Sequence, residues 1–294
     1  MTARVAITHG AEIGRAIEDA LDQLDLVHRF QGRLVAVKAN DTWASPNDRT
    51  AVTQPDTLRA TLRYLKRLSP RRLVVVGGAG AMRTEEVFEL SGLAAVLRQE
   101  GVELVDLNAP PFVEAALTCG PRRKVVVNPF ALEIEALVSL AQLKVHQSTT
   151  VTLSLKNVAL GFPAAGHYGY PRIPTLHPRK PTGGFHRFIA AMVQRFPIHL
   201  AIVAGHPAMV GIGPLGGKTV DTGLVVAGTD PLATDVVAAR ILGFNVHAVQ
   251  HLAEAARLGA GEWDLGRMEI QGLRLADAFA LFWDRVYGGT PPPS

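Results

Sequence analysis

The stretch RLVVVGG, residues 72–78, is the clearest indicator of the fold. Its valines make a strand that is apolar on both faces, which is typical of a parallel strand covered by helices on both sides. Similar short β-branched runs recur along the chain, and each predicts a strand. These runs are VAIT (5–8), LVAVK (34–38), VELVDL (102–107), KVVVN (124–128), LKVH (143–146), HLAIVAG (199–205) and GLVVAG (223–228).

Amphipathic segments separate these runs and predict helices. They lie near residues 11–25, 56–68, 84–99, 131–140, 184–195, 231–242 and 247–258, and a closing strand and helix are expected within 268–287. The alternation predicts an α/β fold with a mostly parallel sheet and helices on both faces. At 294 residues we expect a single domain over 1–294.

Residues 161–185 interrupt this pattern, because proline and glycine are dense there. Such composition predicts a long irregular loop, and long loops inside compact domains are usually functional. Its basic and aromatic residues favour a lid. The alternative is an ordinary connection between two halves. These residues are His167, Tyr168, His177 and Lys180.

The composition restricts the function. Hydrophobic residues make up 48% of the chain and charged residues 19%, with a formal net charge of +4. The basic residues form short groups without interleaved aromatic residues, so a small anionic partner fits better than nucleic acid. Cys119 is the only cysteine, which excludes an intramolecular disulfide and an iron–sulfur cluster held by four thiolates of this chain. The histidine spacing does not support a zinc hydrolase, and no G-x-S-x-G motif supports a serine hydrolase.

The N-terminal residues lack the features of a signal peptide, and no run of 18 apolar residues occurs. We therefore expect a cytoplasmic protein without a membrane partner. Neither the oligomeric state nor a metal or organic cofactor can be predicted.

Polar residues follow the predicted strands, at the ends where open α/β sheets bind ligands. The residues in these positions are Lys38, Asn40, Asp106, Asn108, Asn128 and His146, and glycines follow the strand at 72–78.

The strip KVHQSTTVTLSLKN, residues 144–157, concentrates polar residues in an otherwise apolar chain. If residues 143–146 end a strand, Ser148, Thr149 or Thr150 can cap a helix whose N-terminus favours anions. Thr149, Thr152 and Lys156 would then share one helix face beside His146. The alternative is a capped, solvent-facing helix with an incidental histidine.

Two glycine-rich stretches resemble phosphate-binding loops. Residues 211–219, GIGPLGGKT, place Gly211 and Gly213 at the wrong spacing from Lys218 for a P-loop, but the backbone amides could still contact an anion. Residues 77–86 lack the G-x-G-x-x-G spacing, and close packing of the strand against the next helix explains their glycines equally well.

Two aspartates lie at the predicted helix near 231–242. Asp230 precedes Pro231 and should cap this helix. Asp235 lies one turn later in an apolar run, where it could orient a basic residue in the cleft or pair with Arg240.

These motifs resemble the domain-of-unknown-function 362 family (DUF362) of bacteria and archaea. The pattern K-x-H-x-x-T-x-x-T-x-x-x-K-N is similar to the central family signature. The similarity extends to Lys38-Ala39-Asn40, TQPDTLRATLRYLK, GVELVDLN, AMVGIGPLGGK and LVVAGTDPLATDVVAARILG, in the family order; the signature itself comprises Lys144, His146, Thr149, Thr152, Lys156 and Asn157.

The sequence departs from the family pattern at three points. Ala204 replaces an acidic residue, so that role is missing or has moved to His206, and Ala39 replaces a proline. The ferredoxin-like module of many relatives is absent. A more distant similarity to the N-terminal domain of the lactate racemase family implies that Lys156 anchors a cofactor or forms a Schiff base, with His146 transferring protons.

We therefore predict an enzyme with isomerase-like, racemase-like or lyase-like chemistry on a small anionic substrate. His146 would be the general acid or base and Lys156 the residue that binds covalently or stabilises negative charge. The residues expected to bind substrate are Lys38, Asn40, Lys144, Thr149, Asn157, Gly211, Gly213 and Lys218. The alternatives are a non-catalytic binder or carrier of an anionic metabolite or cofactor and an accessory redox protein.

Overall fold

The computed structural model describes residues 2–172 and 183–289. The strands of its main sheet are β1 (Ala3–His9), β2 (Leu34–Ala39), β3 (Arg72–Gly77), β4 (Glu103–Asp106), β7 (Ala136–His146), β8 (Thr150–Val151), β9 (Leu200–Val210), β10 (Lys218–Val220), β11 (Leu224–Gly228) and β12 (Met268–Gly272). Their order is β12-β1-β11-β9-β7-β2-β3-β4, with β8 paired to β7 and β10 to β9. The predicted mostly parallel sheet is confirmed, but β11 runs antiparallel to both neighbours.

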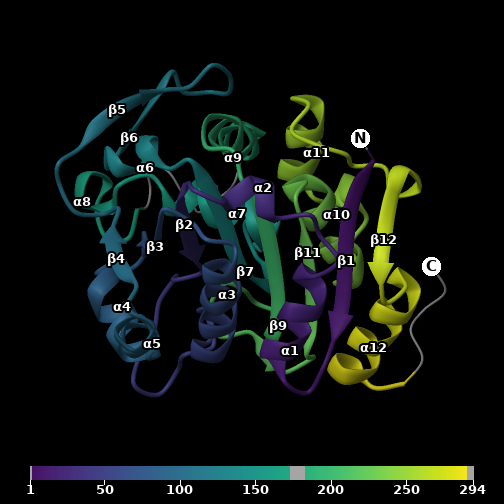
Figure 1. Ribbon diagram of the computed structural model, residues 1–294. Helices are drawn as coiled ribbons and strands as arrows, with labels where there is room; N and C mark the ends of the chain where they lie inside the picture. The colour runs from purple at the N-terminus through teal and green to yellow at the C-terminus, as the bar shows by residue number, and fades with distance from the viewer. Residues whose placement is uncertain (1, 173–182, 290–294) are drawn as a thin grey trace.

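Helices cover both faces of this sheet, as predicted. They are α1 (Ile13–Leu21), α2 (Val27–Phe30), α3 (Pro55–Arg67), α4 (Thr84–Ser91), α5 (Leu93–Glu100), α6 (Phe130–Glu133), α7 (Leu153–Gly161), α8 (Ala165–Tyr168), α9 (Gly183–Arg195), α10 (Pro231–Ile241), α11 (Gln250–Arg257) and α12 (Leu275–Tyr287). Figure 1 shows α1, α3 and α5 along the lower side of the view and α9 and α11 along the upper side.

The valine run at 72–78 explains this two-sided covering. Val75 packs into the core with α1, α3 and α5, whereas Val74 and Val76 pack into the core with α7, α9 and α10. Alternate residues of a strand point to opposite faces, so one apolar run can supply both cores. Among the described residues, no helix is both long and apolar enough to cross a membrane.

The helix predicted over 131–140 is wrong. Only α6 forms there, and strand β7 begins at Ala136, in the middle of the predicted helix. All eleven residues of β7 are buried. A strand covered on both faces needs a continuous apolar run, and such a run cannot be distinguished from a buried helix by periodicity. The strand predicted at 143–146 is therefore the last part of a central strand.

The segment 124–128 does form a strand, β6 (Lys124–Val127), but it lies outside the main sheet. It pairs antiparallel with β5 (Val113–Ala116) in a separate two-stranded sheet. Asn128 is therefore not at the edge of the main sheet, where its strand position had suggested it would be.

The proline-rich and glycine-rich stretch 161–185 is not wholly irregular. Helix α8 forms inside it, and α9 begins before its end. The Tyr168 hydroxyl accepts a hydrogen bond from the backbone N–H of Val126 (2.9 Å), which ties α8 to β6. His177 and Lys180 lie outside the described residues, so the lid stays a prediction.

Candidate functional site

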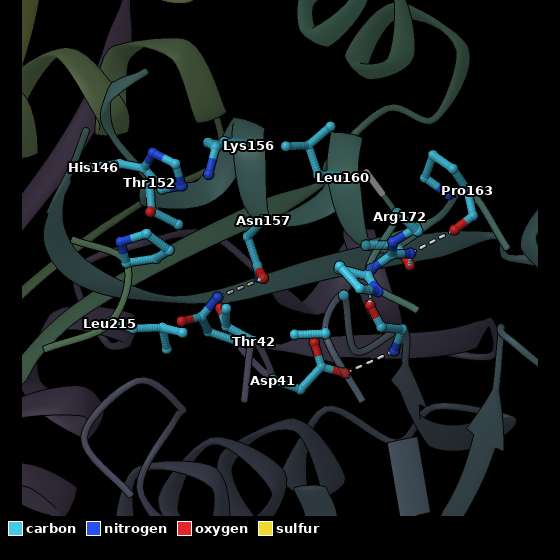
Figure 2. Close-up of a pocket in the computed structure, with 17 residues that line it drawn as sticks. Asp41, Thr42, His146, Thr152, Lys156, Asn157, Leu160, Pro163, Arg172 and Leu215 are labelled. Atoms are coloured by element: carbon cyan, nitrogen blue, oxygen red, sulfur yellow. Dashed lines mark hydrogen bonds between the residues drawn. The ribbon is translucent and has the colours of Figure 1, made fainter. Parts of the chain in front are cut away.

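A cavity of about 220 Å³ lies at the carboxyl ends of β2, β3 and β7, beside α7. This is the place where the strand-end rule predicted a ligand site. Figure 2 shows the side chains that surround it. The lining residues are Asn40, Asp41, Thr42, Gly78, Gly80, Ala81, His146, Thr152, Lys156, Asn157, Leu160, Gly161, Pro163, Pro171, Arg172, Pro214 and Leu215.

Lys156 in α7 contributes an amine to this cavity (Figure 2). The residue is only 6% exposed, and its amine has no hydrogen-bond or ion-pair partner among the described residues. Burial, reinforced by the nearby charge of Lys144, lowers the pKa of Lys156 well below 10.5. A buried amine without an acidic partner is held as the neutral form, which is a nucleophile.

Lys144, in β7, lies behind the cavity wall and is fully buried. Its amine donates to Asn40 Oδ1 (2.8 Å) and to the carbonyl oxygen of Ala51 (3.2 Å). Burial lowers the pKa of Lys144 to about 7, and Lys38 lowers it further whereas Asp41 opposes the shift. Lys144 is thus a partly charged neighbour of Lys156 that does not itself line the cavity.

Asn157 continues this network. Its Nδ2 donates to the carbonyl oxygen of Lys38 (3.0 Å) and to Ser139 Oγ (3.1 Å), and its Oδ1 accepts from Asn40 Nδ2 (3.3 Å). These bonds fix α7 to β2 and β7. Although Asn157 lines the cavity, its amide hydrogens already form hydrogen bonds within the protein.

Lys38, at the end of β2, forms a buried ion pair with Asp41. The second oxygen of Asp41 accepts from the backbone N–H of Gly78 (2.7 Å). Burial lowers the pKa of Lys38, and the Asp41 carboxylate opposes this effect. The pair joins the ends of β2 and β3 below the cavity, so Lys38 supports the site and does not line it.

His146, at the end of β7, lines the cavity beside Thr152 (Figure 2). The backbone N–H of Ser148 donates to Nδ1 of His146 (3.0 Å), so Nδ1 carries a lone pair and Nε2 carries the ring proton. The hydroxyl of Thr152 is buried without a partner among the described residues. Thr152 therefore offers an unused polar group to a ligand.

The backbone around this strip is strained. Thr150 and Leu153 adopt φ values of 66° and 49°, which are uncommon for residues with a Cβ. Such residues cluster at functional sites, where surrounding structure holds them in place. The predicted helix over residues 144–157 forms, but it begins later than predicted. Thr150 and Val151 form β8, the helix begins at Leu153, and Thr149 and Thr152 lie outside it.

Asp235, in α10, holds the start of α7. One of its oxygens accepts from the backbone N–H (2.8 Å) and hydroxyl (2.6 Å) of Ser154, and the other accepts from the backbone N–H of Leu155 (2.8 Å). Both predictions for Asp235 are wrong, because it neither orients a base in the cavity nor pairs with Arg240. Burial raises the pKa of Asp235 to about 7, against these hydrogen bonds. The predicted cap is confirmed at Asp230, which accepts from Ala233 N–H (3.0 Å).

Arg172 brings a cation to the cavity from the stretch that follows α8. Its guanidinium donates to the carbonyl oxygens of Gly78, Gly161 and Pro163. Burial lowers the pKa of Arg172 to about 10, so it stays charged at neutral pH. A Cβ at Gly78 would lie 1.9 Å from the Gly161 oxygen, so this close approach of β3 and α7 requires glycine.

Besides Lys38 and Lys144, four predicted binding residues do not line the cavity. The Thr149 hydroxyl donates to Val151 O (3.0 Å), and the Lys218 amine donates to Val286 O in α12. Gly213 packs so tightly that a Cβ would lie 1.9 Å from Val145 O. Gly211 does not line the cavity either, and the 211–218 loop contributes Pro214 and Leu215 instead. Both residues that this loop contributes to the cavity lining have apolar side chains.

Neither Ala204, which stands where the family has an acidic residue, nor His206 lines the cavity. Ala204 is buried in β9, and His206 lies outside the cavity, where its ring nitrogens contact Asp221 (2.8 Å) and Asp56 (2.9 Å). These carboxylates raise the pKa of His206 to about 9, with the bond to Asp56 as the largest cause.

Sequence reasoning missed two charged residues of the cavity lining, Asp41 and Arg172. The strand-end rule that selected Lys38 and Asn40 also covers Asp41, so this residue could have been found. Arg172 carried no such signal, because its contacts with Gly78 and Gly161 exist only in the folded chain. Within the described residues, no three histidine, cysteine or carboxylate side chains are placed to share a metal ion.

Comparisons with known proteins agree with the signature seen in the sequence. The chain is 21% identical over 229 residues to the thylakoid-associated protein sll1697 of Synechocystis. This aligned region covers 78% of the chain and 68% of the relative. The family model of DUF362, described as a domain of unknown function, matches residues 35–240. Because this match spans more than half of the sequence, the chain belongs to the DUF362 family.

Proposed function

We propose that the protein is an enzyme that binds a small anionic carbonyl compound and forms an imine with it through Lys156. The observation that carries this proposal is the Lys156 amine, which is buried in the cavity wall without a partner among the described residues. A lysine that only stabilised the fold would be expected to hold an acidic or carbonyl partner, as Lys38 and Lys144 do.

The reaction begins with a neutral amine, which the low pKa of Lys156 supplies at neutral pH. Its nitrogen attacks the carbonyl carbon, the carbonyl electron pair moves to oxygen, and the two amine hydrogens leave with that oxygen as water. Nε2–H of His146 is the ring donor that can polarise the carbonyl group.

The imine makes the neighbouring C–H acidic, and transfer of that proton is the step that isomerases, racemases and lyases share. His146 can accept this proton only at a ring nitrogen that carries none, which is Nδ1. The bond from Ser148 must therefore open for His146 to act as the base. Water then hydrolyses the imine, which releases product and restores the amine.

Reductive trapping tests the proposal. The protein is incubated at pH 7 with cyanoborohydride and a panel of oxo acids, pyruvate and levulinate among them, and the modified lysines are mapped by mass spectrometry. We expect an adduct at Lys156 and little at Lys124, a surface lysine paired with Glu114. The Lys156→Met variant should lose the adduct, and Lys124→Met should keep it. Labelling of Lys156 no greater than that of Lys124 would rule out the imine.

A non-catalytic binder or carrier is the second candidate. It is favoured by the completeness of the Lys144, Asn40 and Asn157 network, which needs no ligand to be satisfied. Prolonged incubation separates the two candidates, because a stabilising ligand that is recovered unchanged supports the binder. An accessory redox role would require iron from another chain. We propose a cytoplasmic location; the thylakoid association in the relative's name makes cell fractionation the relevant test.

A further inference from the structure

The cavity has two chemically different ends. Lys156, His146 and Thr152 surround one end, and Arg172 lies at the other, with Asn157 between them (Figure 2). Helix α7 runs along the cavity from Lys156 to Gly161, whose carbonyl oxygen accepts from Arg172. Five residues of helix advance about 7.5 Å at 1.5 Å per residue. The amine and the guanidinium are thus held at opposite ends of the cavity.

The Arg172 end attracts an anion. The guanidinium has five N–H donors, and its hydrogen-bond partners among the described residues are three backbone carbonyls. Asp41 is close enough to raise the pKa of Arg172, but its oxygens are bonded to Lys38 and to the Gly78 N–H. The other nearby carboxylate, Asp106, accepts from the Asn108 N–H (2.9 Å), and its own pKa is raised by burial. Among the described residues neither carboxylate forms a hydrogen bond or ion pair with Arg172, so the guanidinium keeps N–H donors that an anion can accept from.

The surface between the two ends is largely apolar. Leu160 and Pro163 lie along α7 and just beyond it, and Ala81, Pro214 and Leu215 add further apolar lining. The polar residues in this region are Asn157, Asn40, which is bonded to Asn157 and Lys144, and Thr42 (Figure 2). The amide hydrogens of Asn157 are bonded to Lys38 O and Ser139 Oγ. A ligand that spans the cavity should therefore carry uncharged carbon between its two polar ends.

We infer that the substrate is a short oxo acid whose carbonyl group and carboxylate are separated by a chain of methylene groups, as in a 4-oxo or 5-oxo acid. The carbonyl carbon would meet Lys156, and the carboxylate would bind Arg172 in the fork geometry that guanidinium favours. This inference rests on the proposed imine chemistry.

A 2-oxo acid does not fit this arrangement. Its carboxylate is one C–C bond of about 1.5 Å from the carbonyl carbon, so it stays at the amine end. The size of the cavity, about 220 Å³, also limits the ligand. At roughly 30 Å³ per liquid water molecule, this volume corresponds to about seven waters, which suits a compound with on the order of ten non-hydrogen atoms.

The test compares trapping rates at Lys156 for levulinate (4-oxopentanoate), pyruvate and 2-pentanone, each with cyanoborohydride at pH 7. 2-Pentanone has the chain of levulinate without its carboxylate. Each rate is divided by the rate with free lysine, which removes differences in intrinsic reactivity. A charged hydrogen bond is worth a factor of roughly ten or more, so levulinate should exceed both other compounds by at least about tenfold.

In the Arg172→Gln variant the ratio of the levulinate rate to the 2-pentanone rate should fall to near one. If that variant does not fold, the comparison of the three compounds on the unaltered protein decides the question. Pyruvate labelling Lys156 as fast as levulinate, or all three compounds labelling it equally, would overturn the inferred substrate class but leave the imine proposal standing. Failure of every compound to label Lys156 would overturn both.

Discussion

Two lysines of the same strip differ in their surroundings. Lys144 lies in a polar network where its amine bonds to Asn40 and Ala51, whereas Lys156 lies in the cavity wall without a partner among the described residues. Both are almost fully buried, so burial alone does not separate them. The difference shows that satisfied buried polar groups hold the fold together and that an unsatisfied one indicates a place for a ligand.

The largest effect should come from removing the Asp41 carboxylate, which pairs with Lys38. In Asp41→Ala, Lys38 and the Gly78 N–H lose their partner, and Arg172 loses its nearest counter-charge. We expect the free energy of unfolding to fall by about 3–5 kcal/mol, as for other broken buried ion pairs. Urea denaturation measures this change. The control, Asp19→Asn, breaks a surface pair with Arg15 and should change stability by under about 0.5 kcal/mol. A loss for Asp41→Ala as small as that of the control would refute the structural role of the pair.

The same substitution on both lysines tests the comparison itself. Lys144→Met leaves Asn40 Oδ1 and Ala51 O without a donor and should lower the free energy of unfolding by about 1–3 kcal/mol. Lys156→Met removes a buried amine that has no hydrogen-bond or ion-pair partner among the described residues. This substitution should leave the free energy of unfolding unchanged or raise it by about 1 kcal/mol. Thermal and urea unfolding at pH 7 measure both variants. Equal destabilisation by the two substitutions would contradict the distinction between network and cavity wall.

A smaller effect on stability is expected at His206, a partly exposed residue whose ring nitrogens both contact carboxylates. Asp56 and Asp221 raise its folded-state pKa to about 9, above the usual 6.5 of the unfolded chain. The folded state therefore binds this proton more tightly, so the contribution is complete below pH 6.5 and is lost as the pH rises through 9. The carboxylates are about half exposed, which reduces the effect to about 1–2 kcal/mol. The stability difference between the unaltered protein and His206→Gln should shrink by this amount from pH 6 to 9.5; a constant difference would exclude the linkage.

The sequence predicted the layers of the fold because strand and helix periodicities are local properties. It predicted only residues 143–146 of β7 as a strand and placed the start of β7 in a helix, since a strand buried on both faces and a buried helix cannot be distinguished by periodicity. For the site, the strand-end rule identified Asn40 and His146, and the strip motif added Lys156 and Asn157. Spacing along a helix, however, misassigned Thr149, because the strained turn at Thr150 and Leu153 delays the start of α7.

Long-range partners account for the remaining differences. Asp235 caps a helix that lies some eighty residues earlier in the chain, and Arg172 reaches the end of β3. Lys218 carries a charge that suited an anion site, yet its amine bonds to a carbonyl oxygen of α12. Pairings of this kind depend on how distant elements pack, which spacing in the sequence does not record.

The most direct test is the protonation of Lys156 itself. The rate at which acetic anhydride modifies each lysine, measured by mass spectrometry between pH 5 and 11, gives an apparent pKa for each amine. We predict that Lys156 reacts with an apparent pKa well below 10.5. A Lys156 amine with an apparent pKa near 10.5, or one that does not react in the folded protein at any pH, would contradict the account of a neutral amine facing the cavity.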